Sequence, residues 1–356
     1  MEATSRGGIV PKPRKRQVEA GDIAPGLRLP DRTGRQVDLQ GNETAGKPTV
    51  VVFSSGTDSS DNLAAFARIH AEVVELGGQI IAISRARVEG NAKLCRGEGI
   101  EFPLLADPEG TVFEHYGVGG QDGLATFVLD ANQHVLSVLR EPASRQADIA
   151  LAAVRAEAAK RLPRLMEAHP PVLVVPGVLS QEDCRRLITI YNMDGNVWVE
   201  PGHGDKGMTG DYKMRVPEYG RKDRVDHWVV NPETRDFISA RLQDRLFPEI
   251  RKAFQYKITK AETYRIGCYE GERHGDLQGH RDNTAPLVAH RRFAVSVNLN
   301  TEEFEGGELR FPEFGDQRYR PPTGAAIAFS CSLYHEALEV TKGRRYVLMA
   351  FLFGDH

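Results

Sequence analysis

A short stretch in the second half of the chain, CYEGERHGDLQGHRDN (residues 268–283), holds the side chains best suited to chemistry. His280 and Asp282 lie two residues apart, and in an extended strand residues i and i+2 project from the same face. An imidazole nitrogen and a carboxylate oxygen that point the same way can occupy neighbouring positions around one metal ion. The spacing therefore predicts two ligands of a metal site.

A third ligand must come from elsewhere in the chain, and His335 is the best candidate. It follows the apolar strand pattern AAIAFS (residues 325–330) and a short polar continuation of it. Two histidines and one carboxylate leave open positions on the metal, an arrangement that suits non-haem Fe(II). His335 taken alone could also be a core histidine, and an HxD pair alone is common, so the assignment depends on the whole ordered set.

An arginine follows this histidine at an interval of ten residues. Arg345 precedes the apolar run YVLMAF. A guanidinium directed into the mouth of a barrel needs an anion, and a carboxylate bound through two hydrogen bonds is its natural partner. Arg344 and Arg345 are neighbours, so they must face opposite sides of a strand. We expect Arg345 to face the barrel mouth and Arg344 to face solvent.

The elements that must position these residues fall into two groups, with a boundary near residue 165. In the first group, PTVVVFSSG (48–56) has a buried-strand pattern and DNLAAFARIHAEVVEL (61–76) has apolar residues at helical spacing. The strand patterns QIIAIS, ATFVLD and HVLSVL follow. This alternation predicts an α/β sheet with crossover helices. After Thr259 the segments are short, apolar and separated by Gly and Pro, which predicts a double-sheet β-fold.

The predicted organisation has four parts: a disordered tail over residues 1–20, a first domain over 21–160, a linker over 161–168 and a second domain over 169–356. The basic cluster Lys12–Arg16 is interpreted as part of the solvated tail, because short charge runs beside Gly and Pro rarely fold. Residues 196–225 are rich in Gly and charge and are expected to form a long loop. Ser180 is a predicted N-cap of a helix.

Composition excludes several classes of partner. The 356 residues carry a formal net charge of −3, which gives no global attraction to nucleic acid or to anionic membranes. No apolar run approaches the ~20 residues of a membrane helix, and no apolar segment of a secretory signal follows the N-terminal charges. The four cysteines form no CxxC pair. We therefore expect a cytoplasmic protein without nucleic-acid or membrane partners.

The ordered set of motifs in residues 169–356 resembles the prolyl 4-hydroxylase-type Fe(II)/2-oxoglutarate-dependent dioxygenases. The set comprises Tyr269, His280-x-Asp282, NLNTEEFEGGELRF, His335 and Arg345. The resemblance implies an α+β double-stranded β-helix (jelly roll). It implies Fe(II) at His280, Asp282 and His335, with 2-oxoglutarate and O2 as cosubstrates and ascorbate as a candidate reductant.

The resemblance also implies roles around the cosubstrate. It puts Arg345 on the distal carboxylate of 2-oxoglutarate and makes Tyr269 a candidate contact. The Gly-Gly-Glu turn in FEGGELRF is interpreted as structural. Many relatives have a tyrosine two residues before the Asn of the LN pair, whereas this sequence has Asn298. Asn298 is therefore a candidate cosubstrate contact, and we expect cosubstrate binding to depend on other donors than in those relatives.

Residues 21–160 resemble the α/β thioredoxin-like domain of peroxiredoxins. The resemblance rests on GDIAPGLRLPDRTGRQVDL, KPTVVVFSSG, FPLLADPEGTVFEHYGV and ATFVLDANQHVLSVLR. Peroxide reduction needs a low-pKa thiolate at the start of the helix after the first core strand. That region reads SSGTDSSDN and has no cysteine, and Leu124 replaces the proline usual before ATF. Cys95 is interpreted as a structural thiol, so we expect a redox-inactive scaffold for dimerisation or substrate docking.

The leading hypothesis is an Fe(II)- and 2-oxoglutarate-dependent hydroxylase that acts on an aliphatic C–H bond. The substrate, a small molecule or a peptide, stays open: prolyl residues, free amino acids and small natural products all fit. A homodimer through the redoxin-like domain is a further hypothesis. Two alternatives remain at this point, a thiol peroxidase acting through Cys95 and a non-catalytic binding protein.

Overall fold

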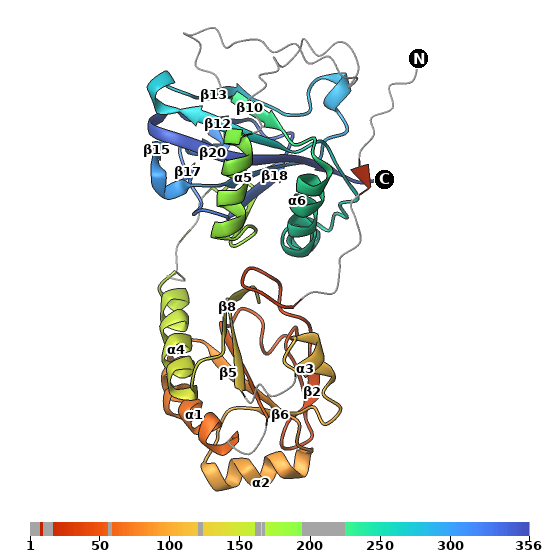
Figure 1. Cartoon of the computed structure of the whole chain (residues 1–356), viewed down its shortest axis with the longest axis vertical. Coiled ribbons are helices and arrows are strands. Elements are labelled where there is room, and N and C mark those ends of the chain that lie inside the picture. Colours follow the sequence, from red (N-terminus) through yellow and green to blue (C-terminus); the bar gives the residue numbers. More distant parts are fainter. Residues whose placement is uncertain are drawn as a thin grey trace. The chain divides into compact units, whose positions relative to one another are not determined.

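The computed structural model describes residues 8–9, 17–55, 59–119, 124–160, 165, 168–193 and 225–355 (Figure 1). The chain divides into two compact units. One unit spans residues 14–165, and the other spans residues 166–356 together with residues 1–13. The loop expected over 196–225 lies outside the described residues except for Val225, as do the basic cluster Lys12–Arg16 and most of the expected linker.

A five-stranded sheet forms the centre of the first unit, with strand order β6-β5-β4-β7-β8. The strands are β4 (Thr49–Ser54), β5 (Gln79–Ser84), β6 (Leu104–Ala106), β7 (Leu124–Leu129) and β8 (Val135–Leu139). β4, β5 and β6 run parallel, whereas β7 and β8 run antiparallel to their neighbours. Every residue of β4 is buried, which explains why its sequence is a continuous Val-rich run without polar alternation.

Helices cover both faces of this sheet. They are α1 (Ser59–Glu75), α2 (Val88–Glu98), α3 (Thr111–His115) and α4 (Ala143–Ala159); a hairpin of β2 (Arg28–Pro30) and β3 (Gln36–Asp38) is separate. Phe66 of α1 and Val154 of α4 pack into one core, and Phe113 of α3 with Tyr116 packs into the core on the other face. The predicted thioredoxin-like fold is confirmed.

Two antiparallel sheets form the second unit. The larger has nine strands, along the path β1-β11-β20-β14-β18-β9 with β10, β12 and β15 attached, and the smaller has the order β13-β19-β16-β17. The strands of the larger sheet are β1 (Gly8–Ile9), β9 (Val172–Val175), β10 (Val225–Trp228), β11 (Lys260–Ala261), β12 (Arg265–Glu270), β14 (Phe293–Asn298), β15 (Phe304–Gly306), β18 (Ala326–Ser330) and β20 (Val340–Phe353). Those of the smaller are β13 (Leu277–His280), β16 (Leu309–Arg310), β17 (Arg318–Tyr319) and β19 (His335–Ala337).

Side chains of both sheets share one apolar core, which includes Leu309 and Ala337 from the smaller sheet and Phe329 and Val347 from the larger. Two sheets packed in this way form the predicted double-stranded β-helix. Short 3-10 helices lie in the connections: η1 (Gly271–Arg273), η2 (Pro286–Val288), η3 (Thr301–Glu303) and η4 (Pro312–Phe314).

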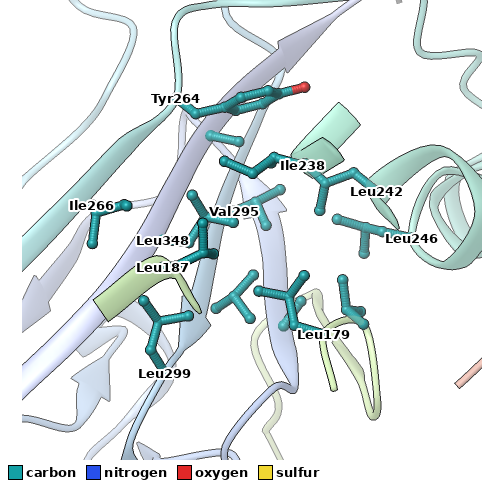
Figure 2. Close-up of a cluster of buried hydrophobic side chains, with 14 of the residues drawn as sticks. Leu179, Leu187, Ile238, Leu242, Leu246, Tyr264, Ile266, Val295, Leu299 and Leu348 are labelled. Carbon is teal, nitrogen blue, oxygen red and sulfur yellow. The ribbon is translucent and has the colours of Figure 1, made fainter. Parts of the chain in front are cut away.

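Three helices cover the opposite face of the larger sheet: α5 (Gln181–Met193), α6 (Pro232–Arg245) and α7 (Phe247–Phe254). Figure 2 shows Leu187 of α5 and Leu242 of α6 beside Val295 and Leu348 of the sheet. Ser180 caps α5 as predicted, because its Oγ accepts a hydrogen bond from the Asp183 N–H at 3.0 Å. The large sheet is therefore buried on both faces.

The N-terminal segment differs from the predicted tail in two places. Gly8–Ile9 form β1, which pairs antiparallel with β11 in the second unit. Val18 is buried in the core of the first unit. A sheet edge offers unpaired main-chain groups, so an extended segment that reaches it gains hydrogen bonds. Within the part of the chain that is described, no helix is long and apolar enough to span a membrane.

Candidate metal centre

Two short strands of the smaller sheet bring two histidines together. His280 at the end of β13 lies directly across from His335 at the start of β19, and their ring centroids are 4.4 Å apart. The sequence pattern suggested that His335 continues the strand AAIAFS. The chain instead turns after β18, where the Leu333 N–H donates to the Ser330 carbonyl at 3.0 Å, and His335 enters the other sheet.

Asp282 completes the cluster two residues after β13 ends. Its Oδ1 lies 3.3 Å from Nε2 of His280, and its Oδ2 lies 3.4 Å from Nε2 of His335. The candidate ligand atoms of the three residues all lie within 4.8 Å of one another. The main-chain N–H of Asp282 donates to the Cys331 carbonyl at 2.9 Å, which ties the ligand to the residue that follows β18 of the larger sheet.

Both histidines use their second ring nitrogen in the same way. Nδ1 of His280 donates to the Gln278 carbonyl at 2.8 Å, and Nδ1 of His335 donates to the Leu333 carbonyl at 3.0 Å. A proton on Nδ1 leaves the lone pair on Nε2, which is the nitrogen that faces Asp282. Main-chain oxygens that fix the tautomer of a histidine are typical of metal-ligating imidazoles. The donor set therefore fits Fe(II).

Electrostatics favour the protonation states that a metal requires. Burial tends to raise the pKa of Asp282, but the side chains of His280 and His335 beside it outweigh this effect and hold the pKa below its usual range, since either imidazole in its protonated form stabilises the carboxylate. Burial lowers the pKa of His335. An ionised carboxylate and a neutral imidazole are the forms that coordinate metal, so both ligands can bind with little proton release near neutral pH.

Arg345 is buried in the same domain, with 3% of its surface exposed. Its Nε and Nη2 donate to Oδ1 of Asn298 at 3.3 and 3.2 Å, and Nη2 also lies 3.4 Å from Oγ of Ser296. Its guanidinium carbon lies 5.1 Å from the ring centroid of Tyr269, which is directly opposite on β12. The side chain of Arg344 is 60% exposed and pairs with Glu270. The structure thus brings Arg345, Tyr269 and Asn298 together.

Comparison with known proteins gives two family assignments. Residues 20–138 match the AhpC/TSA family, and residues 264–353 match the 2OG-Fe(II) oxygenase superfamily. Peroxiredoxin Bcp of Escherichia coli K12 is 30% identical over 128 residues, which cover 32% of this chain and 81% of that protein. The chain belongs to the AhpC/TSA family and carries a 2OG-Fe(II) oxygenase domain.

Two relatives of the oxygenase domain have names that describe them as hydroxylases. A PKHD-type hydroxylase of Synechococcus is 31% identical over 94 residues, 24% of this chain and 41% of that protein. The multifunctional procollagen lysine hydroxylase and glycosyltransferase LH3 of Rattus norvegicus is 24% identical over 185 residues, 49% of this chain and 22% of that protein. The chain thus spans less than half the length of either hydroxylase.

Gly307 of the oxygenase domain contributes to the site in a way the sequence did not indicate. It has a φ of +68°, and a Cβ at this position would lie 3.0 Å from Cδ of Arg345 and 2.9 Å from Val340. The Gly-Gly-Glu turn was interpreted as structural alone. The second glycine also leaves the space that Arg345 fills. Ser296 was missed as well, although its place two residues before Asn298 on one strand puts both on the same face.

In the peroxiredoxin-like domain, Cys95 belongs to α2 and is 5% exposed within the apolar core. Reactive thiols need partial exposure and a cationic environment, and this packing provides neither access nor a polar surrounding. Residues 56–58, in the region where the family thiol is expected, lie outside the described residues, and Leu124 begins β7. All four cysteines of the chain are free and buried.

Proposed function

We propose that the oxygenase domain is an Fe(II)- and 2-oxoglutarate-dependent dioxygenase that hydroxylates an aliphatic C–H bond. The observation that carries this proposal is the convergence of His280, Asp282 and His335 in the domain that also buries Arg345. The superfamily match and the similarity to a PKHD-type hydroxylase support it.

In this proposal the three ligand side chains bind the metal and the buried arginine binds the cosubstrate. His280, Asp282 and His335 would hold Fe(II), and Arg345 would bind the distal carboxylate of 2-oxoglutarate with both arms of its guanidinium. When bound, Fe(II) would supply the oxygen activation that couples conversion of 2-oxoglutarate to succinate and carbon dioxide with hydroxylation of the substrate. Ascorbate is the candidate reductant that keeps the iron ferrous.

Two neighbours of Arg345 would prepare it for the cosubstrate. The Asn298 side chain is fixed, since its Nδ2 donates to the Pro321 carbonyl at 3.1 Å, and its Oδ1 faces the guanidinium. We therefore assign to Asn298 the role of orienting the Arg345 guanidinium. Tyr269 would cover the other side of the guanidinium through its ring.

Aromatic side chains form an apolar wall on one side of His335. The Phe329 ring centroid lies 4.6 Å from that of His335, and Phe311 packs on Phe329 at 5.0 Å. A dry, apolar wall strengthens the electrostatic interactions of the site and protects it from side reactions. The substrate is a small molecule or a peptide. The name of the rat relative makes peptidyl lysine the first side chain to screen, and prolyl residues, which the sequence left open, come next.

Release of succinate tests the proposal directly. The full chain would be loaded anaerobically with Fe(II) and 2-oxoglutarate, exposed to O2, and assayed for succinate with a panel of peptides and small molecules. We expect iron-dependent succinate that is lost in Asp282→Ala. Asp316→Ala, which removes an exposed carboxylate paired with Arg310, is the matched control. Full turnover in Asp282→Ala would refute the ligand assignment.

A further inference from the structure

The loop that carries Asp282 closes on itself. It runs from Asp282, after β13, to Arg291, just before β14, and contains η2. Nη1 of Arg291 donates to the main-chain oxygen of Asp282 at 3.2 Å, so the last residue of the loop holds the first. With the N–H of Asp282 bound to the Cys331 carbonyl, both main-chain polar groups of this residue are fixed.

Arg291 is in turn anchored to the large sheet. Its Nε and Nη2 donate to the two carboxylate oxygens of Glu262, each at 2.7 Å. Glu262 lies between β11 and β12, and its own N–H donates to the Phe351 carbonyl at 2.9 Å. The guanidinium carbon of Arg291 lies 3.7 Å from the Phe351 ring centroid. Two parallel bonds and a ring contact fix the plane of the guanidinium.

This pair is sheltered from solvent, unlike most ion pairs on a protein surface. The side chain of Arg291 is 12% exposed and that of Glu262 is 20% exposed. His290 and Arg265 also lie near the carboxylate, with nitrogens at 3.0 and 3.9 Å from its oxygens. Three basic side chains from two segments therefore surround the Glu262 carboxylate. Removing this carboxylate would leave them without a shared counter-charge.

We propose that Arg291 and Glu262 form a brace that sets the position of Asp282 relative to His280 and His335. This inference rests on the proposed function, because it concerns the ligand geometry of the same metal site. Arg291 does not touch the ligand carboxylate. It is a positioning residue that holds the main chain from which the carboxylate projects. Partners of this kind commonly change metal affinity by about 10- to 100-fold when they are removed.

The metal affinity of the full chain tells whether the Arg291–Glu262 pair positions a metal ligand or only stabilises the fold. Mn(II), which lies beside Fe(II) in the affinity series, serves as the probe, and its binding is measured by titration. We expect Arg291→Met and Glu262→Gln each to weaken Mn(II) binding about tenfold or more. The double variant should be no weaker than Arg291→Met, because the two residues act as one unit. Arg291→Lys keeps the charge but cannot make all three bonds, so it should fall between.

The neighbouring arginine supplies the control. Arg292→Met removes the same charge one position away, where the side chain donates to the Ala289 carbonyl instead. Equal Mn(II) affinity in Arg291→Met and Arg292→Met would overturn the brace. If His280→Ala also bound Mn(II) like the unmodified chain, the metal site itself would be wrong. If His280→Ala loses Mn(II) binding while Arg291→Met binds as tightly as Arg292→Met, the brace is wrong and the proposed function still stands. Should Arg291→Met fail to fold, Arg291→Lys and Glu262→Gln decide the question.

Discussion

At the scale of single residues, two adjacent arginines carry different roles because strand alternation sends them to opposite faces. Truncating Arg345 should leave the distal carboxylate of 2-oxoglutarate unpaired in a sheltered site, a loss of roughly 2–4 kcal/mol. The 2-oxoglutarate concentration for half-saturation should therefore rise roughly 30- to 1000-fold in Arg345→Ala. Arg344→Ala should change it by less than about threefold. Steady-state titrations of both variants measure the difference, and a large effect in Arg344→Ala with a small one in Arg345→Ala would contradict the assignment.

Gly307 gives a second residue-scale prediction. In Gly307→Ala the new Cβ would contact Arg345 and Val340, and the left-handed backbone would add about 1–2 kcal/mol of strain. We expect lower thermal stability and a higher half-saturating concentration of 2-oxoglutarate. Gly34→Ala is the matched control, because Gly34 has a φ of +86° and no neighbour within 4 Å of an added Cβ. If the half-saturating concentration in Gly307→Ala stays unchanged, the space left by this glycine does not matter to Arg345.

Spacing along the strands predicted the ligand pair and the direction of the two arginines, but it could not predict the contacts that support them. The period of two in a strand placed His280 with Asp282 and separated Arg345 from Arg344. Glu262 and Arg291 are 29 residues apart in sequence and meet only because the loop before β14 folds back on β11 and β12. Contacts of that kind depend on the tertiary arrangement, and no periodic pattern in the sequence records them.

At the scale of elements, the tight connection between β7 and β8 depends on one carboxylate. Oδ1 of Asp130 accepts the N–H groups of Asn132 and His134, both at 2.8 Å, and Oδ2 lies 3.0 Å from Nδ1 of His134. Burial tends to raise the pKa of Asp130, but the hydrogen bond from His134 outweighs it and lowers this pKa. The unfolded chain then binds more protons near pH 4 than the folded chain does, so this contribution is present above the unfolded pKa and is lost as the pH falls.

Asp130→Asn should therefore lower the free energy of unfolding of the peroxiredoxin-like domain by about 1 kcal/mol at pH 7. The difference from the unmodified chain should shrink as the pH falls below about 4. Urea unfolding at both pH values measures it. Asp148→Asn, at an exposed position of α4, should be neutral at both. A deficit of the same size at low pH would show that the charge of Asp130 is not the cause.

The elements themselves were predictable to different degrees. β4 and β5 have continuous apolar runs, and their predicted and observed limits nearly coincide. β19 has three residues and follows a turn without Gly or Pro, so the sequence offered no sign that the chain changes sheet after Ser330. Pairing across to β13, a non-local contact, decides the direction of that segment.

At the scale of the whole molecule, the two units should respond separately to metal. A ligand that binds only the folded oxygenase domain stabilises it by about 2.7 kcal/mol at one hundred times its dissociation constant. In calorimetric scans, removing metal with EDTA should lower one unfolding transition and leave the other in place. Phe66→Ala, in the core of the first unit, should cost about 3–5 kcal/mol and identify the unresponsive transition. Equal shifts of both transitions on EDTA addition would show that the units unfold together.

The peroxiredoxin-like domain should show no thiol-dependent reduction of hydroperoxides. Its family chemistry needs an accessible thiolate at the start of α1, and the sequence there has no cysteine. A coupled peroxidase assay with dithiothreitol or thioredoxin as donor measures this. Peroxide consumption that disappears in Cys95→Ser would contradict the prediction and restore the thiol peroxidase as a function.

The burial of all four thiols also makes the chain convenient for site-directed labelling. Maleimide reagents should leave the folded protein unmodified, because all four native thiols are buried. Cysteines introduced at exposed positions such as Val74 in the first unit and Val230 in the second would then be the sole attachment points for a donor–acceptor dye pair. Energy transfer between such dyes would follow the separation of the two units while metal, 2-oxoglutarate or substrate is added.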